Sequence, residues 1–468
     1  MQIIVTILAA AAAIAAGFWG ISGTPQSLLV LLGAVLVAVF AFFSPKGSLV
    51  LLVLSMLLSP ELGLGAVTVN RNVVVRYDDI LLVTIFIAWF ARTAIFKDKP
   101  FITSTPVQTP VVLYTVLCVI STGFGVLRGE IVWNVAFFYV LKYVEYFLLF
   151  FMTVNIVESE EDIRKYMRWG FFVAVIVTLY AYYFYYASGP EARATAPFEV
   201  PMGGDLRESE PASLGGYYLI ILGVLFALLT ETAGMQFLAA FGLIVFIFPA
   251  FLFTFSRSSY LGFAGMMPAL FYFARKRRFL LAGLVSGGLL AMALLPNIYG
   301  KVLNRITMTY SGVYATQVFN AGAAGTIRLE DSAASRVHSM RRALFVHFPK
   351  HPLFGWGVTG VGLADTQYAL VLGELGLLGV VIFAWMLYRL FYTAKIVFFS
   401  YKTPAIRALA LGFILSLCGL LVQSLGVNTF VIVRIMEPFW FIAACLSVLY
   451  IKIPAPEAGP APRNTGGG

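Results

Sequence analysis

The feature that most constrains this chain is a long series of apolar runs, most of them close to 20 residues in length. A helix of about 20 apolar residues crosses the hydrocarbon core of a bilayer, which is about 30 Å thick. Only 12% of the residues are charged and 60% are hydrophobic. Soluble domains carry about 25% charged residues, so the sequence predicts an all-α polytopic membrane protein of about 12–14 transmembrane helices. The runs lie near 2–19, 26–43, 48–59, 79–96, 110–126, 135–154, 168–187, 214–230, 235–255, 259–274, 279–296, 367–390, 404–425 and 432–450. The run at 48–59 is short for a complete crossing and is a candidate re-entrant segment.

Two polar segments interrupt the apolar runs and divide the chain into blocks. The predicted blocks are N-terminal transmembrane helices at 1–187, an outer loop at 188–213, central transmembrane helices at 214–296, a large outer loop at 297–366, C-terminal transmembrane helices at 367–450 and a disordered tail at 451–468.

The basic cluster Arg275-Lys276-Arg277-Arg278 predicts the orientation, because dense basic loops stay in the cytoplasm. With this loop inside, alternation places both chain ends in the cytoplasm and the segments 188–213 and 297–366 outside. The net charge of +10 is then explained by topology signals and by contacts with acidic lipid head groups. Nucleic acid is not an expected partner.

Three cysteines, Cys118, Cys418 and Cys445, all lie inside apolar runs. We expect them to be small buried side chains, and they indicate neither a disulfide framework nor a metal site.

The predicted outer segments are rich in arginine but contain only two lysines, Lys301 and Lys350. Guanidinium groups match phosphate oxygens in a bidentate geometry and keep their charge, so one interpretation is a site for a phosphate or diphosphate at the outer leaflet. The alternative is a set of salt bridges to acidic residues of the same loops. The arginines include Arg71, Arg76, Arg128, Arg193, Arg207, Arg257, Arg328, Arg336, Arg341 and Arg342.

Residues 335–348 read as an amphipathic helix within the large loop, with Ser335 as its N-cap. Arg336 borders the apolar face of this helix and is expected to point into the protein, whereas Arg341 and Arg342 are expected to be solvated or to contact lipid head groups. The predicted apolar face consists of Val337, Met340, Leu344 and Phe348.

Two carboxylates near the next helix are candidates for chemistry. Asp365 lies at the outer mouth of that helix, where it is either an N-cap or a general base. Glu374 lies about 13 Å deeper along a helix and needs a partner there, for which Arg257 is the candidate. The glycine-rich turn His351–Gly357 is either a cradle for an anion or an ordinary turn.

Taken in order, these pieces resemble the O-antigen ligase and polymerase superfamily of bacterial envelope glycosyltransferases. The resemblance covers roughly 190–390, and each element is weak by itself. The elements are Arg193 leading to Pro211–Tyr217, the Ser256-Arg257 turn, Arg336 followed by His351–Gly357, and Glu374-x-Gly376.

The resemblance implies a GT-C-like enzyme in the bacterial cytoplasmic membrane, with its active site on the extracytoplasmic side. It would transfer a glycan from undecaprenyl diphosphate to a saccharide or lipid-linked acceptor, by inversion and without a metal or cofactor. It implies that Arg257 and Arg336 bind the diphosphate with help from Arg193, and that Glu374 belongs to the catalytic site. Ligases of this family carry a His-Asn pair nine residues before the glutamate. Here Asp365-Thr366 occupies that place, which favours polymerase-like members and makes Asp365 the candidate base.

Two other functions remain open. A secondary transporter or flippase would place polar groups near the bilayer midplane on broken helices. A metal-dependent GT-C enzyme would use an acidic pair such as that in Tyr77-Asp78-Asp79. These acids are also what a helix N-terminus beside Arg76 favours, and that simpler interpretation is preferred.

Overall fold

The computed structural model describes residues 25–68, 71–97, 103–189, 192–198, 211–274, 277, 281–283, 286, 296–308, 317–320, 326–362 and 364–454. The predicted run at 2–19, most of that at 279–296, Arg207 and most of the predicted tail lie outside these residues. Within the described part, nine helices are long and apolar enough to cross a membrane. They are α4 (Tyr77–Phe96), α5 (Gln108–Leu127), α6 (Trp133–Ile156), α7 (Glu160–Ala187), α8 (Pro211–Glu231), α9 (Met235–Leu252), α14 (Gln367–Ser400), α15 (Pro404–Gln423) and α16 (Val433–Ile451). This confirms the predicted all-α polytopic membrane architecture.

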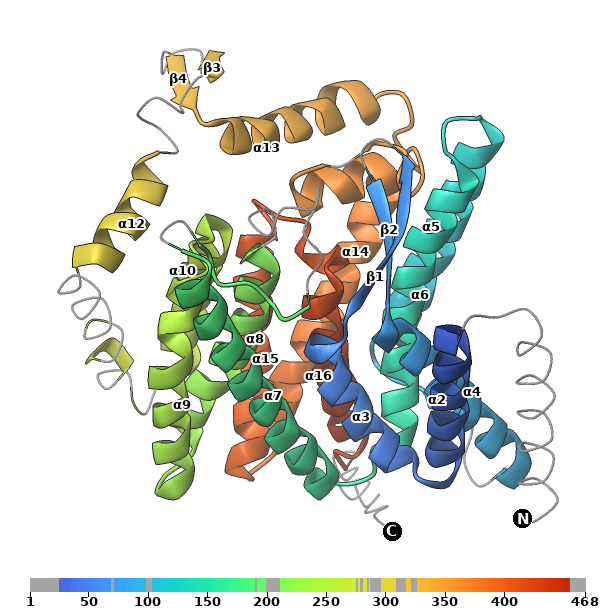
Figure 1. Ribbon diagram of the computed structural model, residues 1–468, viewed down its shortest axis with the longest axis vertical. Helices are drawn as coiled ribbons and strands as arrows, with labels where there is room; N and C mark the ends of the chain where they lie inside the picture. The colour runs from blue at the N-terminus through green and yellow to red at the C-terminus, as the bar shows by residue number, and fades with distance from the viewer. Residues whose placement is uncertain are drawn as a thin grey trace, which may run out of the picture.

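Shorter elements complete the fold. Helix α13 lies across one end of the bundle (Figure 1), and we refer to this end as the capped end. The shorter elements are α2 (Pro25–Phe43), α3 (Pro45–Leu58), α10 (Arg257–Phe273), α12 (Pro296–Thr307), β3 (Gln317–Asn320), β4 (Thr326–Leu329), α13 (Asp331–Arg342), the π-helical turn η4 (Ala343–His347) and the 3-10 turn η5 (Thr429–Val431).

Helix α8 forms the centre of the bundle and is buried almost along its whole length. It packs most extensively against α15. The close approach depends on small residues, because a Cβ added at Gly412 would lie 2.5 Å from the Cα of Val224. A Cβ at Gly223 would lie 2.6 Å from the hydroxyl of Ser416. Small residues are the usual means by which membrane helices approach each other closely.

Charged side chains link helix ends at the opposite end of the bundle. Lys46 at the start of α3 forms an ion pair of 2.9 Å with Asp162 at the start of α7. Arg407 at the start of α15 forms one of 2.7 Å with Glu231 at the end of α8. Arg277 donates to the carbonyls of Leu229 and Thr232, near the turn between α8 and α9. These ion pairs join the start of α3 to the start of α7, and the start of α15 to the end of α8.

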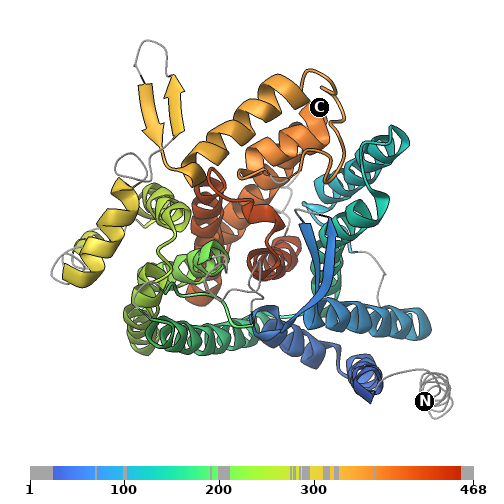
Figure 2. The same cartoon turned by 45° about the horizontal axis from the view of Figure 1, so that its top comes forward.

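The predicted re-entrant run becomes helix α3 followed by a β-hairpin. Helix α3 has 14 residues, about 21 Å at 1.5 Å per residue, which is shorter than a bilayer core. Strands β1 (Glu61–Thr68) and β2 (Arg71–Arg76) then pair in antiparallel register, with Glu61 opposite Arg76. The hairpin rises toward the capped end (Figure 1), and Figure 2 shows it with that end tilted toward the viewer. Helix α4 starts directly after β2, so a β-hairpin rather than an irregular loop connects α3 to α4.

Candidate functional site

The first candidate site lies at the capped end, where Arg257 and Arg336 meet. Arg257 is the first residue of α10, whose N-cap Ser256 accepts a hydrogen bond from the backbone amide of Ser259. Arg336 lies on α13 and donates from Nε to the carbonyl of Gly426 at 2.8 Å. A Cβ added at Gly426 would lie 3.3 Å from Arg336 Nε and 3.3 Å from Ser258 Cβ. The loop between α15 and α16 therefore brings the cap helix against the start of α10.

Two carboxylates accompany these arginines. Glu330, the residue before α13, forms an ion pair with Arg257. Asp365 accepts a hydrogen bond from the hydroxyl of Ser335, and its backbone amide donates to Ser339 at 3.3 Å. The charges of Asp365, Glu330 and Arg257 all act on Arg336. Two guanidinium groups and two carboxylates thus share one charged cluster at the cap helix.

Burial and the neighbouring charge of Arg257 both lower the pKa of Arg336 from its ordinary value, against opposing effects of Asp365 and Glu330. Guanidinium remains protonated in proteins, so Arg336 keeps its charge while losing hydration. A partly dehydrated guanidinium next to a second one attracts a multivalent anion more strongly than a solvated arginine does.

Arg193 belongs to the segment 192–198, which passes close to the same region. The amide of Ala194 donates to the carbonyl of Phe253 at 2.8 Å, so this segment lies against the connection that leads from α9 to Arg257. Arg193 itself is half-buried. The structure therefore groups Arg257, Arg336 and Asp365 directly, and places the segment carrying Arg193 beside them.

The cap helix differs from its predicted bounds. It begins at Asp331, and it passes into a π-helical turn at Ala343, whereas the sequence predicted a start after Ser335. Ser335 is inside the helix, where its hydroxyl binds Asp365 instead of capping. The acidic residues Glu330 and Asp331 at the helix start explain the earlier beginning, because a helix N-terminus favours acids.

The face of the cap helix that packs agrees with the predicted apolar face only in part. Met340 packs against a buried cluster that includes Ala343, and Ala334 and Ala343 are buried at 2% and 3% exposure. Val337 and Leu344, also predicted for the apolar face, are 37% and 41% exposed. Small alanines let the helix lie close to the start of α14, where the buried Ala369 belongs to the same cluster. Arg341 and Arg342 are exposed, in agreement with the prediction.

Glu374 occupies a separate position inside the bundle. Its side chain is buried at 3% exposure, and Oε1 accepts a hydrogen bond from the amide of Thr359 at 2.7 Å. Thr359 adopts a left-handed backbone conformation with φ 75°, which is unusual for a β-branched residue. The predicted partner of Glu374 was Arg257, but among the described residues Arg257 forms its ion pair with Glu330.

The glycine-rich turn His351–Gly357 packs on a break in α14. At Gly376 the helix has φ 64° and ψ −158°, which interrupts its hydrogen bonding. The amide of Trp356 donates to the carbonyl of Gly373 at 3.0 Å, and the amide of Gly357 donates to that of Glu374 at 2.8 Å. Since these amides satisfy carbonyls at the break, they are not available to cradle an anion. The simpler interpretation of this motif as a turn is correct.

Other predicted outer arginines support the salt-bridge alternative in part. Arg128 forms an ion pair of 2.7 Å with Glu130. Arg76 is not on an outer surface at all, because it is buried at 2% exposure. The structure therefore separates the arginine pair of the capped end from Arg76, which is buried beside Asp78, and from Arg128, which contacts Glu130 and the carbonyl of Gly355.

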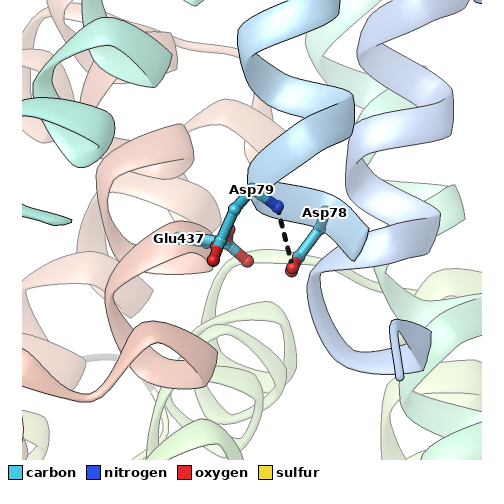
Figure 3. A group of neighbouring side chains, drawn as sticks. All are labelled: Asp78, Asp79 and Glu437. Atoms are coloured by element: carbon cyan, nitrogen blue, oxygen red, sulfur yellow. Dashed lines mark hydrogen bonds between the residues drawn. The ribbon is translucent and has the colours of Figure 1, made fainter. Parts of the chain in front are cut away.

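A second charged cluster lies inside the bundle, at the start of α4. The carboxylate oxygens of Asp78, Asp79 and Glu437 lie within 4.8 Å of one another (Figure 3), close enough to surround one metal ion. Arg76 contacts Asp78 Oδ2 at 2.6 Å and Glu437 Oε2 at 3.8 Å. Lys142 of α6 contacts Asp79 at 3.3 Å. The predicted neighbourhood of Arg76 and the acids is confirmed, but the cluster is buried rather than exposed at an outer helix mouth.

The sequence carried a signal for this second cluster that we did not use. Charged residues within predicted spans, such as Glu145 at 135–154 and Glu437 at 432–450, are expensive in a membrane unless they meet partners. Their presence indicates a buried polar network, although it does not say which spans share it.

No protein-family model matches this chain, and no curated protein matches its sequence significantly.

Proposed function

We propose that this protein is a glycosyltransferase that moves a glycan from undecaprenyl diphosphate to a saccharide acceptor. In this proposal the capped end faces the extracytoplasmic side of a bacterial cytoplasmic membrane, the segment 297–366 is a large extracytoplasmic loop, and the fold is GT-C-like. The acceptor is a second lipid-linked repeat, as in O-antigen or exopolysaccharide polymerases, because Asp365-Thr366 departs from the ligase pattern.

The observation that carries the proposal is the meeting of Arg257, Arg336 and Asp365 beneath the cap helix. Diphosphate is a good leaving group, so its departure needs positive charge more than a strong acid. Two guanidinium groups supply that charge without a metal. A carboxylate held close by accepts the proton of the attacking hydroxyl, as a general base does.

Glu330 fits this scheme as the group that occupies Arg257 before the donor binds. Its carboxylate pairs with the guanidinium at the place where a phosphate oxygen would bind. When the donor binds, its diphosphate replaces Glu330 as the anionic partner of Arg257. The buried guanidinium therefore has an anionic partner both before and after the donor binds.

The test is sugar transfer by the purified protein in detergent with an undecaprenyl-diphosphate-linked donor. Arg336→Lys keeps the charge but loses the planar fork, and we expect transfer to fall at least about a hundredfold, in the range for loss of one preorganised donor. Arg342→Lys is the matched control on the same helix, because Arg342 is exposed. Near-normal transfer by Arg336→Lys would remove the assignment of the site.

A second candidate function is a secondary transporter or flippase for a lipid-linked or anionic substrate. The β-hairpin that connects α3 to α4 and the buried charges at the start of α4 favour it, since transporters bind at broken helices within the membrane. Detergent-solubilised protein cannot transport, so sugar transfer under those conditions decides between the two functions.

A further inference from the structure

The buried cluster at the start of α4 lies on elements that do not carry the arginine pair. Asp78 and Asp79 open α4, Glu145 belongs to α6 and Glu437 to α16. Figure 3 shows Glu437 reaching from its helix toward the two aspartates. The carboxyl of Glu145 adjoins that of Asp79. Three helices that are distant in sequence therefore direct carboxyl groups to one region of the interior.

Three of these four carboxyl groups keep a buried oxygen that receives no hydrogen bond among the described residues. The oxygens are Asp79 Oδ1, Glu145 Oε1 and Glu437 Oε2, whereas Asp78 Oδ2 faces Arg76 Nη2 at 2.6 Å. Glu437 is 1% exposed and Glu145 is 6% exposed, so water does not satisfy them from outside. Buried carboxylate oxygens without a donor are costly, and their convergence suggests a missing positive ligand.

Two basic side chains reach this cluster. Arg76 pairs with Asp78 at 2.6 Å and lies 3.8 Å from Glu437 Oε2, and Lys142 pairs with Asp79 at 3.3 Å. Arg434, one turn before Glu437, donates to the carbonyls of Leu57 and Pro197. The buried oxygens of Glu145 and Glu437 therefore lack a close donor among the described residues, and a bound cation would fill that place.

We propose that Asp78, Asp79 and Glu437 bind one hard divalent metal cation of the magnesium, calcium or manganese class, with the carboxyl of Glu145 beside Asp79 as a supporting group. A donor set made only of carboxylate oxygens selects such cations over zinc or copper. The cation ties the start of α4 to α6 and α16 at the point where the β1–β2 hairpin joins α4. Access is from the side of Asp79, which is the least buried member of the cluster. This proposal does not depend on the proposed function, because the arginine cluster needs no metal.

The experiment measures metal binding directly on the full chain. Purified protein is stripped with chelator in detergent, and Mg²⁺, Ca²⁺ or Mn²⁺ is then titrated at constant pH and ionic strength. We expect one metal per chain by elemental analysis after desalting, and a saturable rise of the melting temperature. Glu437→Gln and Glu145→Gln should each weaken binding at least about tenfold, as changes near metal ligands do. Glu130→Gln is the control, because Glu130 pairs with Arg128 outside the cluster.

Three results would overturn the proposal. One is the absence of both bound metal and a melting shift for all three cations. Another is unchanged affinity in both glutamine variants. The third is stabilisation that follows pH but not metal, which would mean that protons fill the role. If Glu437→Gln does not fold, Glu145→Gln and the stoichiometry of the wild-type chain still decide the question.

Discussion

The break in α14 gives the sharpest prediction, because a single glycine permits it. Gly376 has φ 64° and ψ −158°, a region that residues with a Cβ rarely adopt. A Cβ added at Gly376 would lie 2.6 Å from the carbonyl oxygen of Leu353 and 2.8 Å from the amide nitrogen of Gly355. Both contacts are with backbone, so neither can be relieved by turning a side chain. Gly376→Ala must therefore move the turn or straighten the helix.

The cost has two parts. Holding a residue with a Cβ in this backbone region costs about 1–3 kcal/mol. Forcing the turn away from the helix adds about 1–3 kcal/mol, which is typical of overpacking. We expect Gly376→Ala to lower the free energy of unfolding by about 2–6 kcal/mol in total. It should also displace Glu374, whose carbonyl accepts the amide of Gly357.

Thiol-dye unfolding in detergent provides the assay, since Cys118 and Cys445 are buried at 0% and 2% exposure and react only when the protein opens. The control is Gly242→Ala in α9, where an added Cβ meets nothing within 4 Å. There the change should be neutral or stabilising by up to about 1 kcal/mol. Equal unfolding midpoints for the two variants would refute the reasoning. Ser121→Ala, which removes a bond of 2.9 Å to the Glu374 carbonyl, is a milder test expected to cost about 1 kcal/mol.

Three further outcomes follow from the capped end. Asp365→Asn should lower transfer at least about a hundredfold while donor binding is retained, the loss expected when a general base is removed; equal loss of binding would argue for a structural role. Glu330→Gln should raise the affinity for inorganic pyrophosphate several-fold by releasing Arg257, and weaker binding would contradict this. Burial, with the charges of Arg342 and Lys350, lowers the pKa of His347. The unfolded chain therefore binds the proton more readily, and stability should fall as the pH drops below about 6.5, the ordinary pKa of histidine; His347→Gln should flatten this dependence in melting curves, and an unchanged slope would exclude His347 as its source.

Local patterns explain most of what was predicted correctly. The lengths of the apolar runs determine where spanning helices form, because each must satisfy its own backbone hydrogen bonds in the membrane. The start of α14 at Gln367 matches the prediction, since Thr366 caps it by accepting the amide of Ala369 at 3.2 Å. The β1–β2 hairpin was not predicted, because residues 61–76 lie between the apolar runs at 48–59 and 79–96 and hydropathy alone assigns no structure to them.

The residues of the candidate sites were also predicted only in part from the sequence. Arg257, Arg336 and Asp365 were selected by residue chemistry and by the family resemblance, and the structure brings them together. Glu330 was not selected, because an acid at a helix start is common and its contact with Arg257 spans 73 positions. Asp78 and Asp79 were considered as an acidic pair, but their meeting with Glu145 and Glu437 was not predicted, since the cluster joins α4, α6 and α16 across most of the chain.

By itself the sequence determined that the chain is a bundle of membrane helices, because the hydropathy and the length of a spanning helix are properties of one segment of about 20 residues. It also named the arginines whose chemistry suits an anion. Only the tertiary structure decided which charges are neighbours. Packing placed Arg76 in the interior, gave Arg257 a carboxylate partner, and gathered four carboxyl groups from three helices. Such pairings depend on distances between segments far apart in the chain, and local sequence pattern does not contain them.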